Sequence, residues 1–201
     1  MRFGVLVSGS GTNLQSIIDA CAAGLVPGGV EIVISNREDA YGLARARMAG
    51  IPALFIDPNA YGSAGDYNHA VREALELEEI ECVVMAGYMK LLGAEVLDAF
   101  PMRVVNIHPA LLPSFPGAHG IRDAFDYGVK VTGVTVHFAS EVFDEGPIIM
   151  QEAVAIESDD TLETLESRIH DVEHRLYPAA LAALAEGRVA VEGRTVRIDP
   201  R

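Results

Sequence analysis

The sequence predicts an α/β fold of three layers, in which a mostly parallel sheet ends in antiparallel strands. The first observation is that short runs rich in Val and Ile alternate with helical patterns from Phe3 to Ile107. Strands joined through helices pair in parallel by right-handed crossovers. The second is that two longer strand-like runs after residue 130 are joined by a turn, which favours antiparallel pairing. The third is the lack of a linker, repeat or low-complexity tract, so we expect one domain over residues 1–201.

The parallel part alternates strand and helix in order along the chain. Strands are expected where β-forming residues cluster, at Phe3–Val7, Val30–Ser35, Ala53–Ile56, Cys82–Met85 and Val104–Ile107. Helical patterns lie between them, at Asn13–Ala22, Tyr41–Ala49, Tyr67–Leu77 and Gly93–Ala99.

The antiparallel part follows. In Thr132–Phe138 the residues Val134, Val136 and Phe138 alternate with Thr135 and His137, as in a strand with one apolar face. The run Ile148–Ile156 comes after an Asp-Glu-Gly-Pro turn and is expected to pair with it.

A long helix and a hairpin complete the prediction. Apolar residues at helical spacing indicate a helix over residues 161–187. Asp159, Asp160 and Thr161 suit its start, and Gly187 suits its end. Pro178 predicts a break or a kink inside it. Residues 190–198, interrupted by Glu192-Gly193-Arg194, predict a terminal hairpin.

Charge and composition exclude several classes of function. The formal net charge is −14, and an acidic surface repels nucleic acid, so no nucleic-acid partner is expected. No apolar stretch is long enough to cross a membrane, so we expect a cytoplasmic protein without a membrane partner. Cys21 and Cys82 lie in apolar surroundings and predict two buried thiols without a disulfide or a metal.

A glycine-rich loop, Ser8-Gly9-Ser10-Gly11-Thr12-Asn13, follows the first expected strand and opens the first expected helix. Glycines allow a ligand to approach the backbone, and a helix N-terminus offers free N–H groups to an anion. Leu14 replaces the third glycine of a dinucleotide motif, and no acidic residue ends the second strand, so nicotinamide binding is disfavoured. A site for one phosphate is favoured over a plain turn capped by Thr12 or Asn13.

The most informative stretch is Asn106-Ile107-His108-Pro109, at the end of an apolar run. Side chains at i and i+2 of a strand point the same way, so Asn106 and His108 are expected to project together beyond the strand end. An amide that polarises a carbonyl beside an imidazole that carries a proton predicts carbonyl chemistry. Asp144 alone is typical of a turn, but beside His108 it would stabilise the imidazolium and relay a proton. We assign no role to His137, and these residues do not make a metal site.

Together these motifs resemble the folate-dependent formyltransferases. The resemblance extends over nearly the whole chain, through Ser35–Arg37, Ala86–Lys90, Asn106–Pro109, Asp144–Ile148 and Glu173–Pro178. The Asn-x-His-Pro and Asp-x-Gly-Pro combination is specific to the superfamily, and the glycine loop with Glu-His-x-x-Tyr-Pro is typical of its glycinamide ribonucleotide branch. The resemblance implies a Rossmann-like formyltransferase fold. It also implies transfer of a formyl group from the cosubstrate 10-formyltetrahydrofolate to the amine of 5′-phosphoribosylglycinamide, in purine (IMP) biosynthesis, with no metal.

The resemblance further implies which residues act. Asn106 and His108 would stabilise the oxyanion, and Asp144 would assist proton transfer. The ribonucleotide would be held by Gly11, Thr12, Asn13, His170 and Glu173. The folate would be surrounded by Met89, Lys90, Leu91, Leu92, Ser140, Glu141, Val142 and Phe143.

The sequence departs from the family pattern at two places, and three other enzymes of the superfamily have to be considered as alternatives. Relatives often carry a folate-contacting Arg in the segment that corresponds to Tyr61–Tyr67, where this chain has none, and Lys90 or Arg72 would have to substitute. His170 stands where relatives often have Gln or Lys.

A methionyl-tRNA formyltransferase would need a further RNA-binding domain, a formyltetrahydrofolate deformylase usually has an N-terminal regulatory domain, and a sugar formyltransferase would need a longer nucleotide surface. A non-catalytic folate or nucleotide sensor would tend to lose the catalytic residues. The sequence leaves open whether the chain forms a homodimer.

Overall fold

The computed structural model describes residues 1–200. It contains a seven-stranded sheet in the order β3-β2-β1-β4-β5-β6-β7 and a separate pair of strands, β8 and β9. The strands are β1 (Arg2–Val7), β2 (Gly29–Ser35), β3 (Ala53–Phe55), β4 (Cys82–Met85), β5 (Val104–His108), β6 (Val131–Phe138), β7 (Ile148–Ala155), β8 (Val189–Glu192) and β9 (Thr195–Ile198). The helices are α1 (Thr12–Ala22), α2 (Tyr41–Met48), the short 3₁₀ helix η1 (Pro58–Ala60), α3 (Ala64–Leu77), α4 (Ala94–Leu97), α5 (Gly120–Tyr127) and α6 (Leu162–Ala185).

The predicted α/β fold class is confirmed. Strands β1 to β5 pair in parallel, and β5 with β6 and β6 with β7 pair antiparallel. Two helix predictions need correction. Helix α5 was not predicted, because the Pro- and Gly-rich residues before it read as loop, and α6 has no break at Pro178, where a break or a kink was predicted. Pro178 is buried, so tertiary packing of α6 compensates for the backbone hydrogen bond that proline cannot make.

The start and end of α6 follow the sequence signals. The Thr161 hydroxyl accepts from Thr164 N–H and the Thr164 hydroxyl accepts from Thr161 N–H, which is a capping box. Gly187 has a φ of 70° directly after the helix, a conformation that glycine adopts without strain. In residues 1–200 no helix is both long enough and apolar enough to span a membrane.

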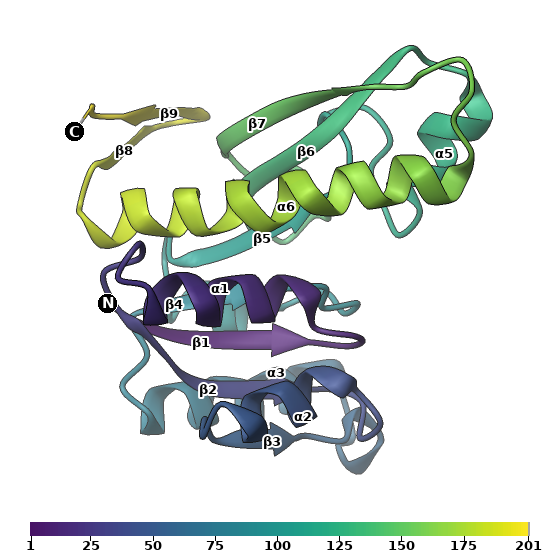
Figure 1. The fold of residues 1–201 in the computed structure, drawn as a ribbon. Helices are drawn as coiled ribbons and strands as arrows, with labels where there is room; N and C mark the ends of the chain where they lie inside the picture. The colour runs from purple at the N-terminus through teal and green to yellow at the C-terminus, as the bar shows by residue number, and fades with distance from the viewer. Residues whose placement is uncertain (201) are drawn as a thin grey trace.

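Two apolar cores lie on opposite faces of the sheet, because successive strand residues point to opposite sides. In β1, Phe3, Val5 and Val7 belong to the core shared with α1, α2 and α6, whereas Leu6 belongs to the core shared with α3 and α4. Figure 1 shows α1 and α6 on one face of the sheet and α3 behind it.

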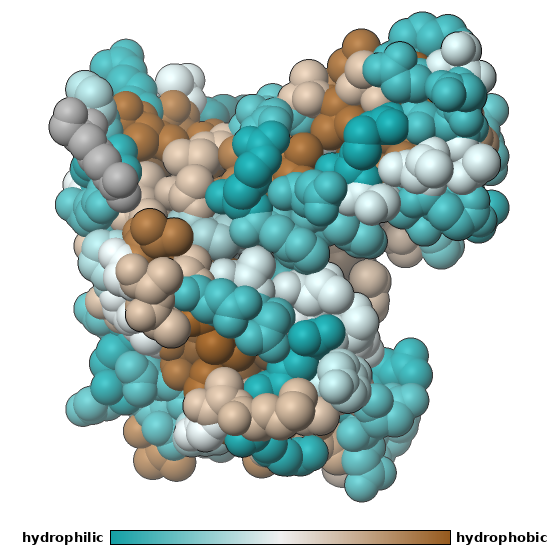
Figure 2. Space-filling view, viewed as in Figure 1, coloured by the Kyte–Doolittle hydropathy of each residue, from teal (hydrophilic) through white to brown (hydrophobic). Residues whose placement is uncertain are grey.

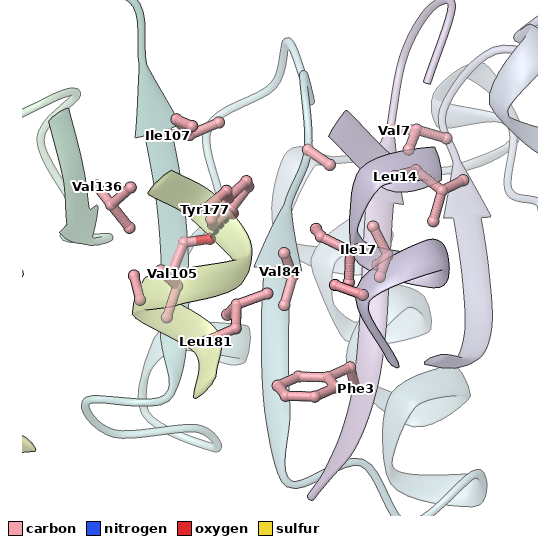
Figure 3. Close-up of a cluster of buried hydrophobic side chains, with 14 of the residues drawn as sticks. Phe3, Val7, Leu14, Ile17, Val84, Val105, Ile107, Val136, Tyr177 and Leu181 are labelled. Carbon is pink, nitrogen blue, oxygen red and sulfur yellow. Dashed lines mark hydrogen bonds between the residues drawn. The ribbon is translucent and has the colours of Figure 1, made fainter. Parts of the chain in front are cut away.

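Tyr177 joins α6 to the centre of the sheet. It is fully buried, and its hydroxyl lies 2.9 Å from the carbonyl oxygen of Val105 and 3.2 Å from that of Met85. Figure 3 shows it beside Val105, in the same apolar core as Leu14 and Ile17 of α1. One side chain of α6 therefore contacts both β4 and β5, the strands that lead to the site.

The strand order reverses between β1 and β4, since one chain connection leads from β1 to β2 and another from β4 to β5. Ligands of open α/β sheets bind beyond the carboxyl ends of the strands at such a switch point. Viewed as in Figure 1, the molecule is hollowed on the right, between the beginning of α6 and the turn that enters α1 (Figure 2).

Candidate active site

Asn106 and His108 lie at the carboxyl end of β5 and both line one cavity of about 260 Å³, as their spacing predicts. Strand β6 contributes a residue that sequence reasoning missed. His137 is paired opposite Asn106, and its Nε2 lies 3.1 Å from Asn106 Nδ2. His137 Nδ1 lies 2.8 Å from the carbonyl oxygen of Phe138, so Nδ1 carries the proton and Nε2 accepts from the amide. One amide N–H of Asn106 is thereby fixed, and the other remains for a ligand.

The polar face of β6 is not exposed to solvent. Thr135 is 0% exposed and His137 is 1% exposed. The Thr135 hydroxyl donates to the Ala110 carbonyl and accepts from Leu112 N–H, so it fixes the loop that follows His108. The alternation predicted the strand, but only the pairing of β5 with β6 reveals what its polar residues contact.

Asp144 contacts both histidines from the loop between β6 and β7. Its Oδ2 lies 3.5 Å from His108 Nδ1 and its Oδ1 lies 3.6 Å from His137 Nε2. Its backbone has a φ of 58°, which turns the side chain inward, and Gly117 N–H donates to Oδ2 at 2.8 Å. Burial raises the pKa of Asp144, but the Gly117 N–H and the two adjacent histidines outweigh burial and hold the pKa below its ordinary value. Asp144 is therefore a carboxylate at neutral pH.

The His108 ring is held on both sides. Nδ1 faces Asp144, and Nε2 lies 2.7 Å from the carbonyl oxygen of Phe115, to which an Nε2–H donates. A carboxylate on one side and a carbonyl on the other match the two N–H groups of an imidazolium. Gly120, at the start of α5, packs closely against this ring. A Cβ at this position would lie 3.0 Å from Nε2, so a larger residue there would crowd the His108 ring.

A second cavity of about 250 Å³ adjoins the first, and both include Gly87, Met89, Ile107 and Pro109. Its far end is formed by the glycine loop, and its lining includes Gly11, Thr12, Asn13, His170 and Glu173, the five residues expected to hold the ribonucleotide. No side chain caps the first turn of α1, and Gly11 has a φ of 70°. The alternative of a turn capped by Thr12 or Asn13 is therefore wrong, and the N–H groups at this helix start are open to an anion.

Buried Asn13 and Glu173 form a hydrogen-bonded network with the half-exposed His170 beside this loop. Asn13 Nδ2 donates to Glu173 Oε2 at 3.2 Å, and His170 Nδ1 donates to the same oxygen at 2.8 Å. Asn13 Oδ1 is buried without a hydrogen-bond partner, although buried acceptors are normally satisfied. The acceptor Asn13 Oδ1 therefore has no hydrogen-bond donor. The hydrogen bond with Glu173 raises the pKa of His170, although burial lowers it.

The residues expected to surround the folate separate into two groups. Leu91, Leu92, Ser140, Val142 and Phe143 line a small hollow beside Asn106, His137 and Asp144, and Met89 lines the larger cavity. Lys90 and Glu141 line neither. The Lys90 ammonium lies 5.4 Å from the centre of the Tyr67 ring, outside both hollows. Arg72 forms an ion pair with Glu76 on α3, so it is not in the site either.

Comparison with known proteins gives the family of the chain. A profile of the formyl transferase family matches residues 1–181. The chain belongs to the formyl transferase family. It is 39% identical to the phosphoribosylglycinamide formyltransferase of Bacillus subtilis (strain 168), over 91% of this chain and 94% of that protein. By this full-length similarity its place in the family is among the phosphoribosylglycinamide formyltransferases.

A solved structure and a longer relative extend the comparison. The crystal structure of glycinamide ribonucleotide transformylase 1 from Symbiobacterium toebii is 54% identical, with a TM-score of 0.97 over 98% of this chain and 93% of that one. The trifunctional purine biosynthetic protein adenosine-3 of Gallus gallus is 41% identical over 95% of this chain, which spans only 19% of that protein. In residues 1–200 no group of three or more His, Cys, Asp or Glu side chains is placed to hold a metal.

Proposed function

We propose that this protein transfers a formyl group from 10-formyltetrahydrofolate to the amine of 5′-phosphoribosylglycinamide. The observation that carries the proposal is that Asn106, His108 and Asp144 line one cavity, and that this cavity adjoins the one formed by the glycine loop. One cavity ends at an uncapped helix start, which suits a phosphate, and the other continues into an apolar hollow, which suits a flat ring system. The names of the full-length relatives support the same pair of substrates.

The chemistry assigned to the three residues follows from their contacts. The neutral amine attacks the formyl carbon, a new C–N bond forms, and negative charge develops on the formyl oxygen. The free N–H of Asn106 donates to that oxygen, and the charged His108 stabilises it. Asp144 accepts the proton that the amine loses, directly or through water, and the proton passes to the folate nitrogen as its bond to the formyl carbon breaks.

His108 must change one partner in this reaction. Both ring nitrogens are engaged in the structure, by Phe115 and by Asp144. We propose that Nε2 releases the Phe115 carbonyl when the formyl oxygen arrives, because Nδ1 faces the carboxylate of Asp144 and Nε2 faces only a neutral carbonyl. The loop from Pro109 to Gly117 would then move slightly as the site fills.

The ribonucleotide would lie along the second cavity. Backbone N–H groups of Gly11, Thr12 and Asn13 would bind its phosphate, and Glu173 would accept from the sugar hydroxyls. The folate would occupy the side lined by Leu91, Leu92, Ser140, Val142 and Phe143, with Lys90 and Glu141 at its outer end. The single domain over residues 1–201, the homodimer and the cytoplasmic location stay predictions.

The experiment that tests the proposal compares acceptors. The rate of folate deformylation is measured spectroscopically with glycinamide ribonucleotide, with an amino-sugar nucleotide and without an acceptor. We expect turnover only with glycinamide ribonucleotide. Equal turnover without an acceptor would indicate hydrolysis, and turnover only with the amino-sugar nucleotide would indicate a sugar formyltransferase.

A further inference from the structure

The glycine loop rests on helix α2, which contributes no residue to either cavity. Gly42 N–H donates to the Gly9 carbonyl oxygen at 3.0 Å. A Cβ at Gly11 would lie 2.7 Å from the Gly42 Cα, so the two backbones touch with no space for a side chain. The first turn of α2 is therefore the surface against which the loop is folded.

Arg45, one turn further along α2, holds the glycine loop in place through its charged guanidinium group. Its Nε donates to the Ser10 carbonyl oxygen at 2.8 Å, and its Nη1 donates to Gln15 Oε1 on α1 at 3.2 Å. The guanidinium carbon lies 5.0 Å from the centre of the Tyr41 ring, a distance typical of a cation–π contact. One guanidinium thus holds the loop, α1 and α2 in one arrangement.

The contact with Ser10 determines where Gly11 N–H points. The C=O and N–H of one trans peptide point in opposite directions. Because the Ser10 carbonyl points to Arg45, the N–H of the same peptide, which belongs to Gly11, points away from α2. Gly11 lines the cavity, so this N–H is available to an anion there.

Among the residues that line this cavity, only His170 can carry a positive charge. No Lys or Arg is among the residues that line it, and the whole chain carries a net charge of −14. Arg45 is bonded to the loop from behind, where its charge acts on the bound anion without contacting it.

We propose that Arg45 is a positioning residue for the phosphate of the ribonucleotide. It acts through Ser10, by orienting the Gly11 N–H and by adding positive charge behind the loop. The proposal rests on the assignment of this cavity to the ribonucleotide in the proposed function.

The test uses the full chain with Arg45→Ala, Arg45→Lys and a matched control, Arg47→Ala. Arg47 is exposed on the same helix, and its side chain makes no hydrogen bond or ion pair in residues 1–200. Binding of ribose 5-phosphate is measured by calorimetry, and the KM values of both substrates and kcat are measured by steady-state kinetics. Ribose 5-phosphate is the probe because it carries the phosphate and the sugar hydroxyls and needs no turnover.

We expect Arg45→Ala to weaken ribose 5-phosphate and to raise the KM of the ribonucleotide by about 10-fold or more, the loss typical of a hydrogen bond to a charged group. The KM of the folate and kcat should stay within about twofold. Arg45→Lys should lie between, because lysine keeps the charge without the fixed guanidinium geometry. Arg47→Ala should resemble the wild-type protein.

The proposal is overturned if Arg45→Ala changes both KM values equally, which would indicate general loss of structure, or if Arg47→Ala has the same effect, which would indicate net charge alone. It is also overturned if ribose 5-phosphate binds Arg45→Ala as tightly as wild-type. Failure of the proposed function is distinguishable. In that case no acceptor supports formyl transfer by the wild-type protein, whereas the calorimetric comparison of the variants still reports on Arg45.

Discussion

At the scale of single residues, most hydrogen-bonding groups of the site already have a partner within the protein, and few are free to bind a ligand. His137 occupies one N–H of Asn106, Phe115 and Asp144 occupy the two sides of His108, and Gly117 fixes Asp144. A reacting group that enters the cavity therefore meets one free amide N–H of Asn106 and the ring of His108. Such preorganisation is what stabilises a developing oxyanion.

The first prediction concerns His108 and Asp144. His108→Ala should lower kcat by about 10²–10³, because a charged group beside the oxyanion is lost. Asp144→Asn should lower kcat by a factor on the order of 10²–10⁴, because the amide cannot accept the proton. The KM values should stay close to wild-type in steady-state assays. The control is His119→Ala, since His119 is exposed at the start of α5 and does not cap it. Near-native turnover in either active-site variant would refute the assigned roles.

The second prediction concerns His137. His137→Leu should lower kcat by about 10-fold or more with little change in KM, because Asn106 loses the acceptor that orients its amide. His137→Gln, whose side-chain oxygen can accept the same hydrogen bond, should recover part of the loss. Equal rates for the two variants would show that His137 serves packing alone.

The residue scale also shows what sequence could predict. The i, i+2 spacing was enough to bring Asn106 and His108 into one cavity, since it depends only on strand geometry. His137 could not be found in this way, because its contact with Asn106 depends on the register of β5 against β6, which neither strand encodes by itself.

At the scale of elements, α6 connects the two cavities to the rest of the molecule. Its first half carries His170 and Glu173, and Tyr177 bonds to the carbonyls of β4 and β5 one turn later. The sequence predicted both ends of α6 through Thr161 and Gly187, because caps are local signals. It predicted a break or a kink at Pro178, and the helix continues without a break, because packing against the sheet is not local.

The third prediction is a pH dependence that belongs to α6. The hydrogen bond with Glu173 raises the pKa of His170 above 6.5, and Glu166 and Asp171 add to this effect. The imidazolium attracts a phosphate below that raised pKa, and the attraction is lost as the pH rises through it. Calorimetry with ribose 5-phosphate between about pH 6.5 and 9 should therefore show binding that weakens as the pH rises.

His170→Gln is the control for this pH profile, because glutamine keeps a hydrogen-bond donor and does not titrate. Its binding of ribose 5-phosphate should depend less on pH over the same range. An identical pH profile in the variant and the wild-type protein would show that His170 does not face the phosphate.

At the scale of the whole molecule, the sheet brings distant segments to one edge. The glycine loop follows β1, the Gly87 turn follows β4, and Asn106 and His108 end β5. These segments were recognisable in the sequence as separate motifs. Their convergence follows from parallel pairing. Asp144 reaches them differently: β6 runs antiparallel to β5 and ends opposite Val105, so the loop of residues 139–147 has to fold back to bring Asp144 to His108.

The fourth prediction tests how α6 is attached to this sheet. Tyr177→Phe should lower the free energy of unfolding by about 1–3 kcal/mol, because a buried carbonyl of β4 or β5 loses its donor. Burial raises the pKa of Tyr177, so the hydroxyl remains a donor at any pH at which the protein is studied. Urea unfolding measures the change. The exposed Tyr127→Phe is the control, and equal stability of the two variants would contradict this role of Tyr177.

The most direct test of the central claim follows the formyl carbon itself. 10-Formyltetrahydrofolate labelled with ¹³C in the formyl group is incubated with the protein and glycinamide ribonucleotide, and the products are observed by NMR. The account predicts that the label appears in the formamide of the ribonucleotide, at a rate that His108→Ala lowers by about 10²–10³. Label that appears as free formate at the same rate with and without the ribonucleotide would contradict it.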